Sequence, residues 1–171
     1  MVTITKATEK DAQQIVEIGI KTFLEAHEHS SPKEIMDNYL SEKFDIKTIK
    51  AELSDVRIIY HILYYKNRPA GYSKIVMDEG HPNINTPNIT KLERIYLLKE
   101  FYGMKLGYQL FKFNLDLSKR NKQKGMWLFV WVDNLRAANF YIKTGFKIIG
   151  KHDFQLSPSH SNPNHHMFYK Y

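Results

Sequence analysis

The stretch Asp133-Asn-Leu-Arg-Ala-Ala-Asn-Phe-Tyr-Ile-Lys-Thr-Gly-Phe146 contains both the start and the end signals of a short helix. Asn134 can cap its first turn, and Gly145 can close it in a left-handed conformation. The preceding run, Met126-Trp-Leu-Phe-Val-Trp-Val132, has no alternation of apolar and polar residues. It therefore predicts a central strand covered on both faces, followed at once by a compact helix over Asn134–Thr144.

The rest of the chain divides into helical and strand patterns around that unit. Apolar residues three or four positions apart, behind capping residues such as the serine of Ser31-Pro-Lys-Glu34, predict helices. Alternating apolar residues, as from Val56 to Tyr64, predict strands, and Asp78–Thr90 is the longest expected loop. This order predicts a mixed α/β layer structure. The expected helices are Thr8–Ala26, Pro32–Leu40, Asp45–Leu53, Leu106–Asn121 and Asn134–Thr144, and the expected strands are Val2–Thr5, Val56–Tyr64, Ala70–Met77, Leu92–Leu98, Met126–Val132, Phe146–Ile149 and Met167–Tyr171.

The composition fits one globular domain over residues 1–171 with a substantial core, since 43% of the residues are hydrophobic. The chain has no cysteine, which excludes disulfides and thiol catalysis. Its first residues are too polar for a secretory signal, and no apolar run approaches the roughly 20 residues that span a bilayer. We therefore expect a cytoplasmic protein with no membrane partner. The net charge of +7 favours an anionic ligand, but it does not choose among nucleic acid, a polyphosphate cofactor and an acidic surface.

Two glycines lie four positions apart in Phe101-Tyr-Gly-Met-Lys-Leu-Gly-Tyr-Gln-Leu-Phe111, where the expected helix begins at Leu106. A helix start has N–H groups without intrahelical partners and carries about half a positive charge. Gly103 can direct successive N–H groups inward, Gly107 leaves room for a phosphate, and Lys105 adds a cation. The alternative is that both glycines serve the turn geometry alone. The pattern matches neither a Walker loop nor a Rossmann fingerprint.

These segments together resemble a known family, the GNAT superfamily of N-acetyltransferases. Within it, Leu92–Gly150 most resembles the PaiA-type spermidine/spermine acetyltransferases. The first motif departs from the family's usual pattern, because Tyr102 replaces a basic or amide residue and Lys105 replaces the first glycine. The motifs that carry the likeness are Leu92-Glu-Arg-Ile-Tyr-Leu97, Phe101-Tyr-Gly-Met-Lys-Leu-Gly107 and Trp131-Val-Asp-Asn-Leu-Arg-Ala-Ala-Asn-Phe-Tyr-Ile-Lys-Thr-Gly-Phe146.

The resemblance implies a GNAT-like fold, with a central mixed, mostly antiparallel sheet and helices on both faces. In such a fold the strand that carries Ile95–Leu97 splays from the strand Met126–Val132, and the pantetheine of acetyl-CoA lies in the gap. The diphosphate of this co-substrate would lie on the Tyr102–Gly107 turn, and no metal is implied. The cofactor-binding residues that the resemblance implies are Ile95, Tyr96, Leu97, Tyr102, Gly103, Met104, Lys105, Leu106, Gly107, Asn134, Arg136, Ala137 and Tyr141.

Two residues are catalytic candidates, Glu93 from its place beside the implied cofactor strand and Tyr141 from the resemblance. An alkyl ammonium has a pKa of about 10.4 and must lose a proton before it can attack, which requires a base or a desolvated pocket. Glu93 is the candidate base, because it precedes the cofactor strand; the alternative is a strand carboxylate paired with Arg94 or a lysine. Tyr141 matches the family's general acid by its place in the motif, and a phenol is usable there because its ordinary pKa, about 10, exceeds that of a thiol, about 8.5. On its residue pattern alone, Tyr141 would be a core tyrosine.

The expected function is direct transfer of an acetyl group from acetyl-CoA to a primary amine of a small acceptor, with a polyamine as the finer prediction. The alternatives are a non-catalytic CoA-binding regulatory or interaction protein of the same fold and, less favoured, a nucleic-acid-binding module. A homodimer is compatible with the sequence, which does not decide the oligomeric state. The acidic residues that could line a polycation pocket, or could equally be solvated helix faces, are Glu25, Glu28, Glu34 and Asp37.

Two further polar clusters are interpreted as structural. Basic residues gather at the end of the expected central helix, where cations complement the helix dipole. Histidines in the polar C-terminal segment could bind a metal, but without cysteines or an organised acidic partner we expect no metal site. The basic cluster is Lys119, Arg120, Lys122 and Lys124, and the histidines are His160, His165 and His166, near Pro158 and Pro163.

Overall fold

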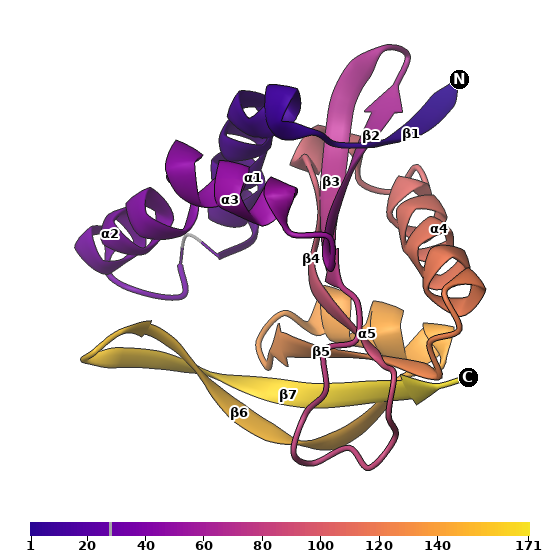
Figure 1. Cartoon of the computed structure of the whole chain (residues 1–171). Helices are drawn as coiled ribbons and strands as arrows, with labels where there is room; N and C mark the ends of the chain where they lie inside the picture. The colour runs from indigo at the N-terminus through magenta and orange to yellow at the C-terminus, as the bar shows by residue number, and fades with distance from the viewer. Residues whose placement is uncertain (28) are drawn as a thin grey trace.

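In the computed structural model, the described part of the chain, residues 1–27 and 29–171, forms one seven-stranded sheet with helices packed on it (Figure 1). The strands are β1 (Val2–Lys6), β2 (Ile58–Tyr65), β3 (Arg68–Val76), β4 (Thr90–Leu97), β5 (Gly125–Trp131), β6 (Lys147–Ser157) and β7 (His160–Lys170). The helices are α1 (Ala12–His27), α2 (Lys33–Lys43), α3 (Ile46–Ser54), α4 (Leu106–Arg120) and α5 (Leu135–Thr144), with 3-10 turns η1 (Glu9–Asp11) and η2 (Lys99–Phe101). The strand order is β1-β2-β3-β4-β5-β7-β6, and neighbouring strands are antiparallel except for the parallel pair β4 and β5.

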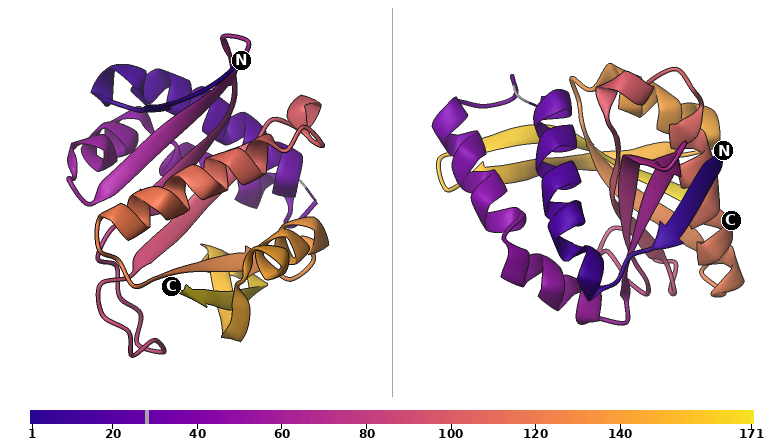
Figure 2. Two further views of the ribbon diagram at one scale, coloured as in Figure 1. Left: turned by 90° about the vertical axis from the view of Figure 1, so that its right-hand side faces the viewer. Right: turned by 90° about the horizontal axis from the view of Figure 1, so that it is seen from above.

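Helices cover both faces of the sheet. Figure 1 shows α1, α2 and α3 on one side of the upper strands and α4 on the other. In the left view of Figure 2, α4 crosses in front of the central strands. The start of α4 reaches α5, where the rings of Phe111 and Phe140 meet edge to face with their centroids 5.6 Å apart. The predicted fold class, a mixed and mostly antiparallel sheet between helices, is therefore confirmed.

Several helix starts follow the capping signals in the sequence. The Thr8 N–H donates to Asp11 Oδ2 over 2.7 Å, and Asp45 accepts from two N–H groups in the first turn of α3. The prediction that Ser31 caps α2 is wrong, because Pro32 occupies the cap position and no side chain caps that helix. Within residues 1–27 and 29–171, no helix combines the length and apolarity that a bilayer crossing requires.

The central strands are buried on both faces. In β2, Ile62, Leu63 and the polar His61 are all buried, so this strand has two covered faces instead of the single apolar face that its alternation predicts. Val56, which belongs to the same alternation, precedes the strand and is 91% exposed. β5 is buried along most of its length, as its uninterrupted apolar run predicts.

The C-terminal strands are longer than the sequence predicts. The sequence predicts strands at Phe146–Ile149 and Met167–Tyr171, whereas β6 and β7 form one long hairpin that extends from Lys147 to a turn after Ser157. Most of β6 is exposed to solvent, so its polar residues carry no hydrophobic alternation that would reveal a strand. The polar histidine-containing segment is therefore strand β7 and not a loop.

Gly71 allows β3 and β4 to approach closely. A Cβ at residue 71 would overlap Leu97 Cδ2 and the Tyr96 carbonyl oxygen. We expect Gly71→Ala to lower the free energy of unfolding by roughly 1–3 kcal/mol, because overpacking forces buried atoms apart. Gly150→Ala is the matched control, since a Cβ there meets only His166 Cβ, 3.9 Å away. Urea unfolding measures both variants, and equal stabilities would contradict the close approach.

Candidate active site

β4 and β5 separate after only two paired residues. Their parallel register joins Thr90 to Met126 and Lys91 to Trp127, and it does not continue beyond them in the described residues. Among the described residues, the remainder of β4, including Ile95–Leu97, pairs with β3 alone, so its other edge has no strand partner there. The splayed strand pair that the resemblance implies is therefore present.

A bulge at Glu93 lies beside this separation. On β3, Lys74 faces Arg94 and Ile75 faces Leu92, so Glu93 has no direct partner in the register. A β-bulge bends its strand and increases the local twist. The bend occurs where β4 leaves β5, and it turns the outer half of β4 away from β5.

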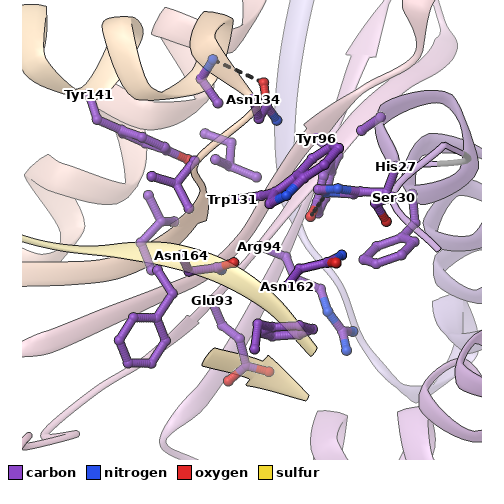
Figure 3. Close-up of a pocket in the computed structure, with 18 of the residues that line it drawn as sticks. His27, Ser30, Glu93, Arg94, Tyr96, Trp131, Asn134, Tyr141, Asn162 and Asn164 are labelled. Carbon is purple, nitrogen blue, oxygen red and sulfur yellow. Dashed lines mark hydrogen bonds between the residues drawn. The ribbon is translucent and has the colours of Figure 1, made fainter. Parts of the chain in front are cut away.

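A cavity of about 670 Å³ opens between the separated strands, a size typical of small-molecule sites. Its walls come from β4, β5, the helices on both sides and the β6–β7 hairpin (Figure 3). The predicted cofactor-binding residues that line it are Ile95, Tyr96, Leu97, Tyr102, Gly107, Asn134, Arg136, Ala137 and Tyr141. The others, Gly103, Met104, Lys105 and Leu106, belong to the turn before α4, where the Leu106 side chain is buried in the core.

The turn from Tyr102 to Gly107 places an uncapped helix start at the cavity. Gly103 and Lys105 adopt left-handed conformations, with φ of 80° and 59°, and no side chain caps α4. A Cβ on Gly103 would meet nothing within 4 Å, so this glycine serves the backbone conformation. A Cβ on Gly107 would lie in ordinary contact, 3.5 Å from Leu97 Cδ1, so the fold tolerates a side chain there. Packing therefore does not require a glycine at residue 107, whereas a first helical turn without a side chain there leaves room for an anion.

The start of α5 lies next to this turn. The Arg136 guanidinium lies over the Tyr102 ring, 3.6 Å from its centroid, in a cation–π contact. The Asn134 side chain caps α5 by accepting the Ala137 N–H over 3.2 Å. Capping engages the Asn134 oxygen and leaves its amide nitrogen as a donor. The two interpretations of Asn134, as a helix cap and as a cofactor contact, are therefore compatible.

Tyr141 has a buried ring and a hydroxyl at the cavity. Its ring packs against Phe140 and Phe146, with centroids 5.4 Å and 5.5 Å away. Figure 3 shows the hydroxyl directed toward the cavity interior. Burial raises the pKa of Tyr141, which keeps the phenol protonated at neutral pH. That is the protonation state that a proton donor requires.

Glu93 belongs to a chain of ion pairs at the cavity wall. Lys74 Nζ lies 2.7 Å from an oxygen of Glu93 and 2.7 Å from an oxygen of Glu52, and Lys91 Nζ lies 3.5 Å from Glu93. Burial acts to raise the pKa of Glu93, but the charges of Lys74 and Lys91 together outweigh burial and lower the pKa to about 2. Of the two interpretations of Glu93, the paired strand carboxylate describes its ground state, and its partners are lysines.

His27, at the end of α1, is a cavity residue with no sequence signal of its own. Its Nε2 lies 3.2 Å from Tyr96 Oη, and its ring centroid lies 5.8 Å from that of Trp131. Burial lowers the pKa of His27 to about 4, so the imidazole is neutral at pH 7. Tyr96 is 69 residues away in the sequence, and no local motif joins the two.

The acidic residues predicted for a polycation pocket are dispersed. Glu25 lines the cavity, but it accepts a backbone N–H at the start of η2 over 2.7 Å. Glu34 and Asp37 lie on the exposed side of α2 and do not line the cavity, and Glu28 lies outside the described residues. Glu52, which no sequence pattern indicates, lines the cavity instead.

The basic cluster at the end of α4 and the histidines of β7 have structural roles. Lys119 and Arg120 occupy the last turn of α4, as predicted. His166 on β7 packs against His81, with ring centroids 4.2 Å apart, and burial lowers the pKa of His166 to about 4. In the part of the chain that the structure describes, no three histidine or acidic side chains are grouped to hold a metal ion.

Comparison with known sequences gives a consistent set of relatives. Residues 13–146 match the model of the acetyltransferase (GNAT) family. The chain is 30% identical over 155 residues to an uncharacterised N-acetyltransferase in the pepI 3′ region of Lactobacillus delbrueckii subsp. lactis, which covers 91% of this chain and 90% of the relative. It is 25% identical over 152 residues to an uncharacterised N-acetyltransferase of Mycobacterium tuberculosis, covering 89% and 93% of the two chains.

Solved structures share the fold over nearly the whole chain. The PaiA N-acetyltransferase from Thermoplasma acidophilum in complex with coenzyme A superposes with a TM-score of 0.80 at 20% identity, covering 100% of this chain and 99% of that chain. The ribosomal-protein-S18-alanine N-acetyltransferase from Escherichia coli superposes with a TM-score of 0.71 at 16% identity, covering 99% and 94%.

Lys74 is the cation whose removal should most change the ionisation of Glu93. We expect Lys74→Met to raise the pKa of Glu93 from about 2 toward or above its ordinary 4.5, because burial then acts with less opposition. A carbon-13 NMR titration of the Glu93 carboxyl group measures this pKa. Lys91→Met is the matched control, since Lys91 Nζ is farther from the carboxylate and its removal should give a smaller rise.

The same ion pair sets the sign of a pH effect on stability. A carboxyl group whose pKa is lower in the folded protein adds stability above its unfolded pKa, near 4.5, and this addition is lost as the pH falls toward 2. The free energy of unfolding should therefore decrease less steeply over that range in Lys74→Met than in the parent protein. Equal slopes and an unchanged Glu93 titration would contradict the ion pair.

Proposed function

Because the chain belongs to the acetyltransferase (GNAT) family and is an acetyl-CoA-dependent N-acetyltransferase, we propose that it transfers the acetyl group directly to a primary amine of a small acceptor in the cavity between β4 and β5. The observation that carries this proposal is the separation of the two strands after Lys91, which opens a cavity beside Tyr141. The free edge of β4 offers N–H and C=O groups along this cavity. An extended pantetheine chain can bind such an edge as an added strand would.

The Tyr102–Gly107 turn would hold the diphosphate of acetyl-CoA. Its uncapped N–H groups, the positive end of the α4 dipole and Lys105 all favour a negative charge. Arg136 adds a guanidinium beside Tyr102. Gly103, Met104 and Leu106 would contribute through the backbone of the turn, while Ile95–Leu97 would line the pantetheine.

Acetyl-CoA supplies an activated thioester, and the side chains around the cavity would position the amine and transfer protons. The neutral amine attacks the carbonyl carbon, the carbon–sulfur bond breaks, and the leaving thiolate takes the proton of the Tyr141 hydroxyl. The proton that the nitrogen loses restores the phenol. N–H groups on the free edge of β4 would donate to the carbonyl oxygen as negative charge develops on it.

Deprotonation of the amine depends on the cavity as well as on a base. Glu93, the predicted base, lines the cavity, but a pKa near 2 makes it a weak proton acceptor at neutral pH. Burial of an ammonium group lowers its pKa, because the charged form loses its hydration. Desolvation of the bound amine is therefore the larger contribution in this proposal, and Glu93 is the smaller one.

A polyamine is the acceptor that the sequence resemblance suggests, and it is the finer version of this proposal. A bound polycation needs carboxylates that are free to pair with it. Glu52 and Glu93 line the cavity, but Lys74 already pairs with both. An acceptor panel must therefore include spermidine and spermine together with amino acids, aminoglycosides and peptide N-termini.

Tyr141→Phe should lower kcat by roughly 10²-fold or more, because the variant lacks the proton donor but retains the packed ring. The KM for acetyl-CoA should change little. Release of free CoA thiol across the acceptor panel measures both constants. Tyr169→Phe is the matched control, since Tyr169 lies on β7 outside the cavity and packs against Phe146.

The thiol-release assay, together with thermal melting and gel retardation, distinguishes the alternative functions. A protein whose melting temperature rises with acetyl-CoA but which releases no thiol with any amine would favour the non-catalytic CoA-binding alternative. Equal kcat values for Tyr141→Phe and Tyr169→Phe would exclude Tyr141 as the proton donor. Salt-sensitive retardation of DNA or RNA in a gel would favour the nucleic-acid alternative.

Gly107→Ala should weaken acetyl-CoA binding without weakening the fold. A methyl group there stays in ordinary contact with Leu97, so the free energy of unfolding should be unchanged or raised by up to about 1 kcal/mol. The same methyl group would stand against the diphosphate, so the KM for acetyl-CoA should rise roughly tenfold. Acetyl-pantetheine lacks the diphosphate, and its kcat/KM should not change. An equal loss with both donors would contradict a diphosphate site at this turn.

A further inference from the structure

Arg94 is a buried cation on the cavity wall that forms no ion pair with a carboxylate of the described residues. It is only 9% exposed and lines the cavity. Within residues 1–27 and 29–171, no aspartate or glutamate oxygen lies within 4.0 Å of its guanidinium nitrogens. A buried charge ordinarily has such a partner, because removing it from water is costly.

The contacts of the Arg94 guanidinium engage few of its donors. Nη1 donates to Tyr60 Oη over 3.3 Å, and Cζ lies over the Phe44 ring, 4.6 Å from its centroid. A guanidinium has five N–H donors, so most of them are unused by the described residues. None of its nitrogens is both sealed from solvent and unpaired, so the unused donors are open to solvent, and Arg94 lines the cavity.

The nearby carboxylates are already engaged. Glu52 accepts from Lys74 and from a tyrosine hydroxyl, and Glu93 is paired with Lys74 and Lys91. Among the described residues two carboxylates thus face three cations, and these five side chains leave a net positive charge at this end of the cavity. Figure 3 shows Glu93 and the Arg94 guanidinium well away from Tyr141, so the cavity has a cationic end separate from the proposed thioester.

A neutral donor also lies at this end. Tyr39 lines the cavity, and its hydroxyl interacts electrostatically with Arg94. Burial raises the pKa of Tyr39 to about 12, despite the opposing charge of Arg94, so the phenol stays protonated and can donate to an anion. Arg94 therefore has the companion that an anion-binding site requires.

We propose that Arg94 binds a carboxylate of the acceptor, so that the substrate is a small molecule with both a primary amine and a carboxylate. This inference rests on the proposed function, because it concerns the acceptor of the same reaction. A carboxylate matches the planar fork of a guanidinium and can accept two parallel N–H bonds. With its carboxylate at Arg94, the acceptor extends its amine toward Tyr141. A polyamine would instead add positive charge to an end that is already cationic.

Matched acceptors test this proposal directly. The ω-amino acids from glycine to 6-aminohexanoate are each compared with the alkylamine and the diamine of the same length, by release of CoA thiol. We expect the best ω-amino acid to have a kcat/KM roughly ten- to a hundredfold above its matched alkylamine, because the alkylamine loses the charged hydrogen bonds. It should also exceed spermidine.

Arg94→Met should abolish that preference by raising the KM for the ω-amino acid, with little change for the alkylamine. Lys43→Met is the matched control, since it also removes a positive charge from the cavity lining. The Lys43 side chain is 46% exposed and lies 3.9 Å from Glu42, so its removal should preserve the preference. Arg94→Lys keeps the charge without the fork and should restore only part of the preference.

Several results would overturn the assignment. A parent enzyme that prefers spermidine or the alkylamines would overturn the assignment, whether or not the variants fold. A preference for the ω-amino acid that survives in a folded Arg94→Met would also overturn it. Failure of every amine to consume acetyl-CoA would instead reject the proposed function. In that case calorimetry with the N-acetyl ω-amino acids still tests Arg94, since binding by the parent but not by Arg94→Met supports the site and binding by neither rejects it.

Discussion

The cavity of this protein depends on the separation of two parallel strands, β4 and β5. β4 and β5 are paired at two positions and then diverge, which leaves one edge of β4 without a ladder partner. Backbone N–H and C=O groups inside a protein need partners, so such an edge persists only where water or a ligand can reach it. Close packing at Gly71 holds the far half of β4 on β3, and β7 holds β5 along its whole length. The cavity is the consequence of these two attachments.

The pairing of β4 with β3 also brings two positive charges next to each other. Lys74 and Arg94 are direct cross-strand neighbours, an unfavourable arrangement unless anions lie nearby. The bulge brings Glu93 to Lys74, and α3 supplies Glu52 to the same ammonium group. Both anions form ion pairs with Lys74, and within the described residues the direct contacts of the Arg94 guanidinium are a hydroxyl and a ring. The charge of Glu93 acts on Arg94 only from beyond ion-pair distance. A local rule broken in this way is expected at functional or strained sites.

Short sequence motifs predicted the structural features whose contacts lie within a few residues of each other. Asn134 and Gly145 bound α5 as expected, because a capping residue and the backbone group with which it forms a hydrogen bond lie within a few residues of each other. The contact of His27 with Tyr96 and the pairing of Lys74 with Glu52 join distant segments, and no spacing in the sequence encodes them. The sequence predicted only the first residues of β6 and the last residues of β7, because the solvent-exposed extension of the hairpin needs no apolar alternation. Tyr141 and Glu93, the two catalytic candidates, both line the cavity, but the ionisation of Glu93 follows from its tertiary partners.

One end of the cavity is built from backbone groups and the other from side chains. A shared backbone fold therefore does not imply a shared acceptor. The proposed cofactor end consists of a strand edge and a helix start, which are backbone features, so the substitutions at Tyr102 and Lys105 leave its amide groups in place. The proposed acceptor end consists of side chains from β4, including Glu93 and Arg94, from α1, α2 and α3, and from the β6–β7 hairpin. Changes in those side chains need not disturb the parted strands. A backbone that superposes with a TM-score of 0.80 at 20% identity therefore shows a shared fold, whereas the proposed choice of acceptor depends on the side chains around Arg94.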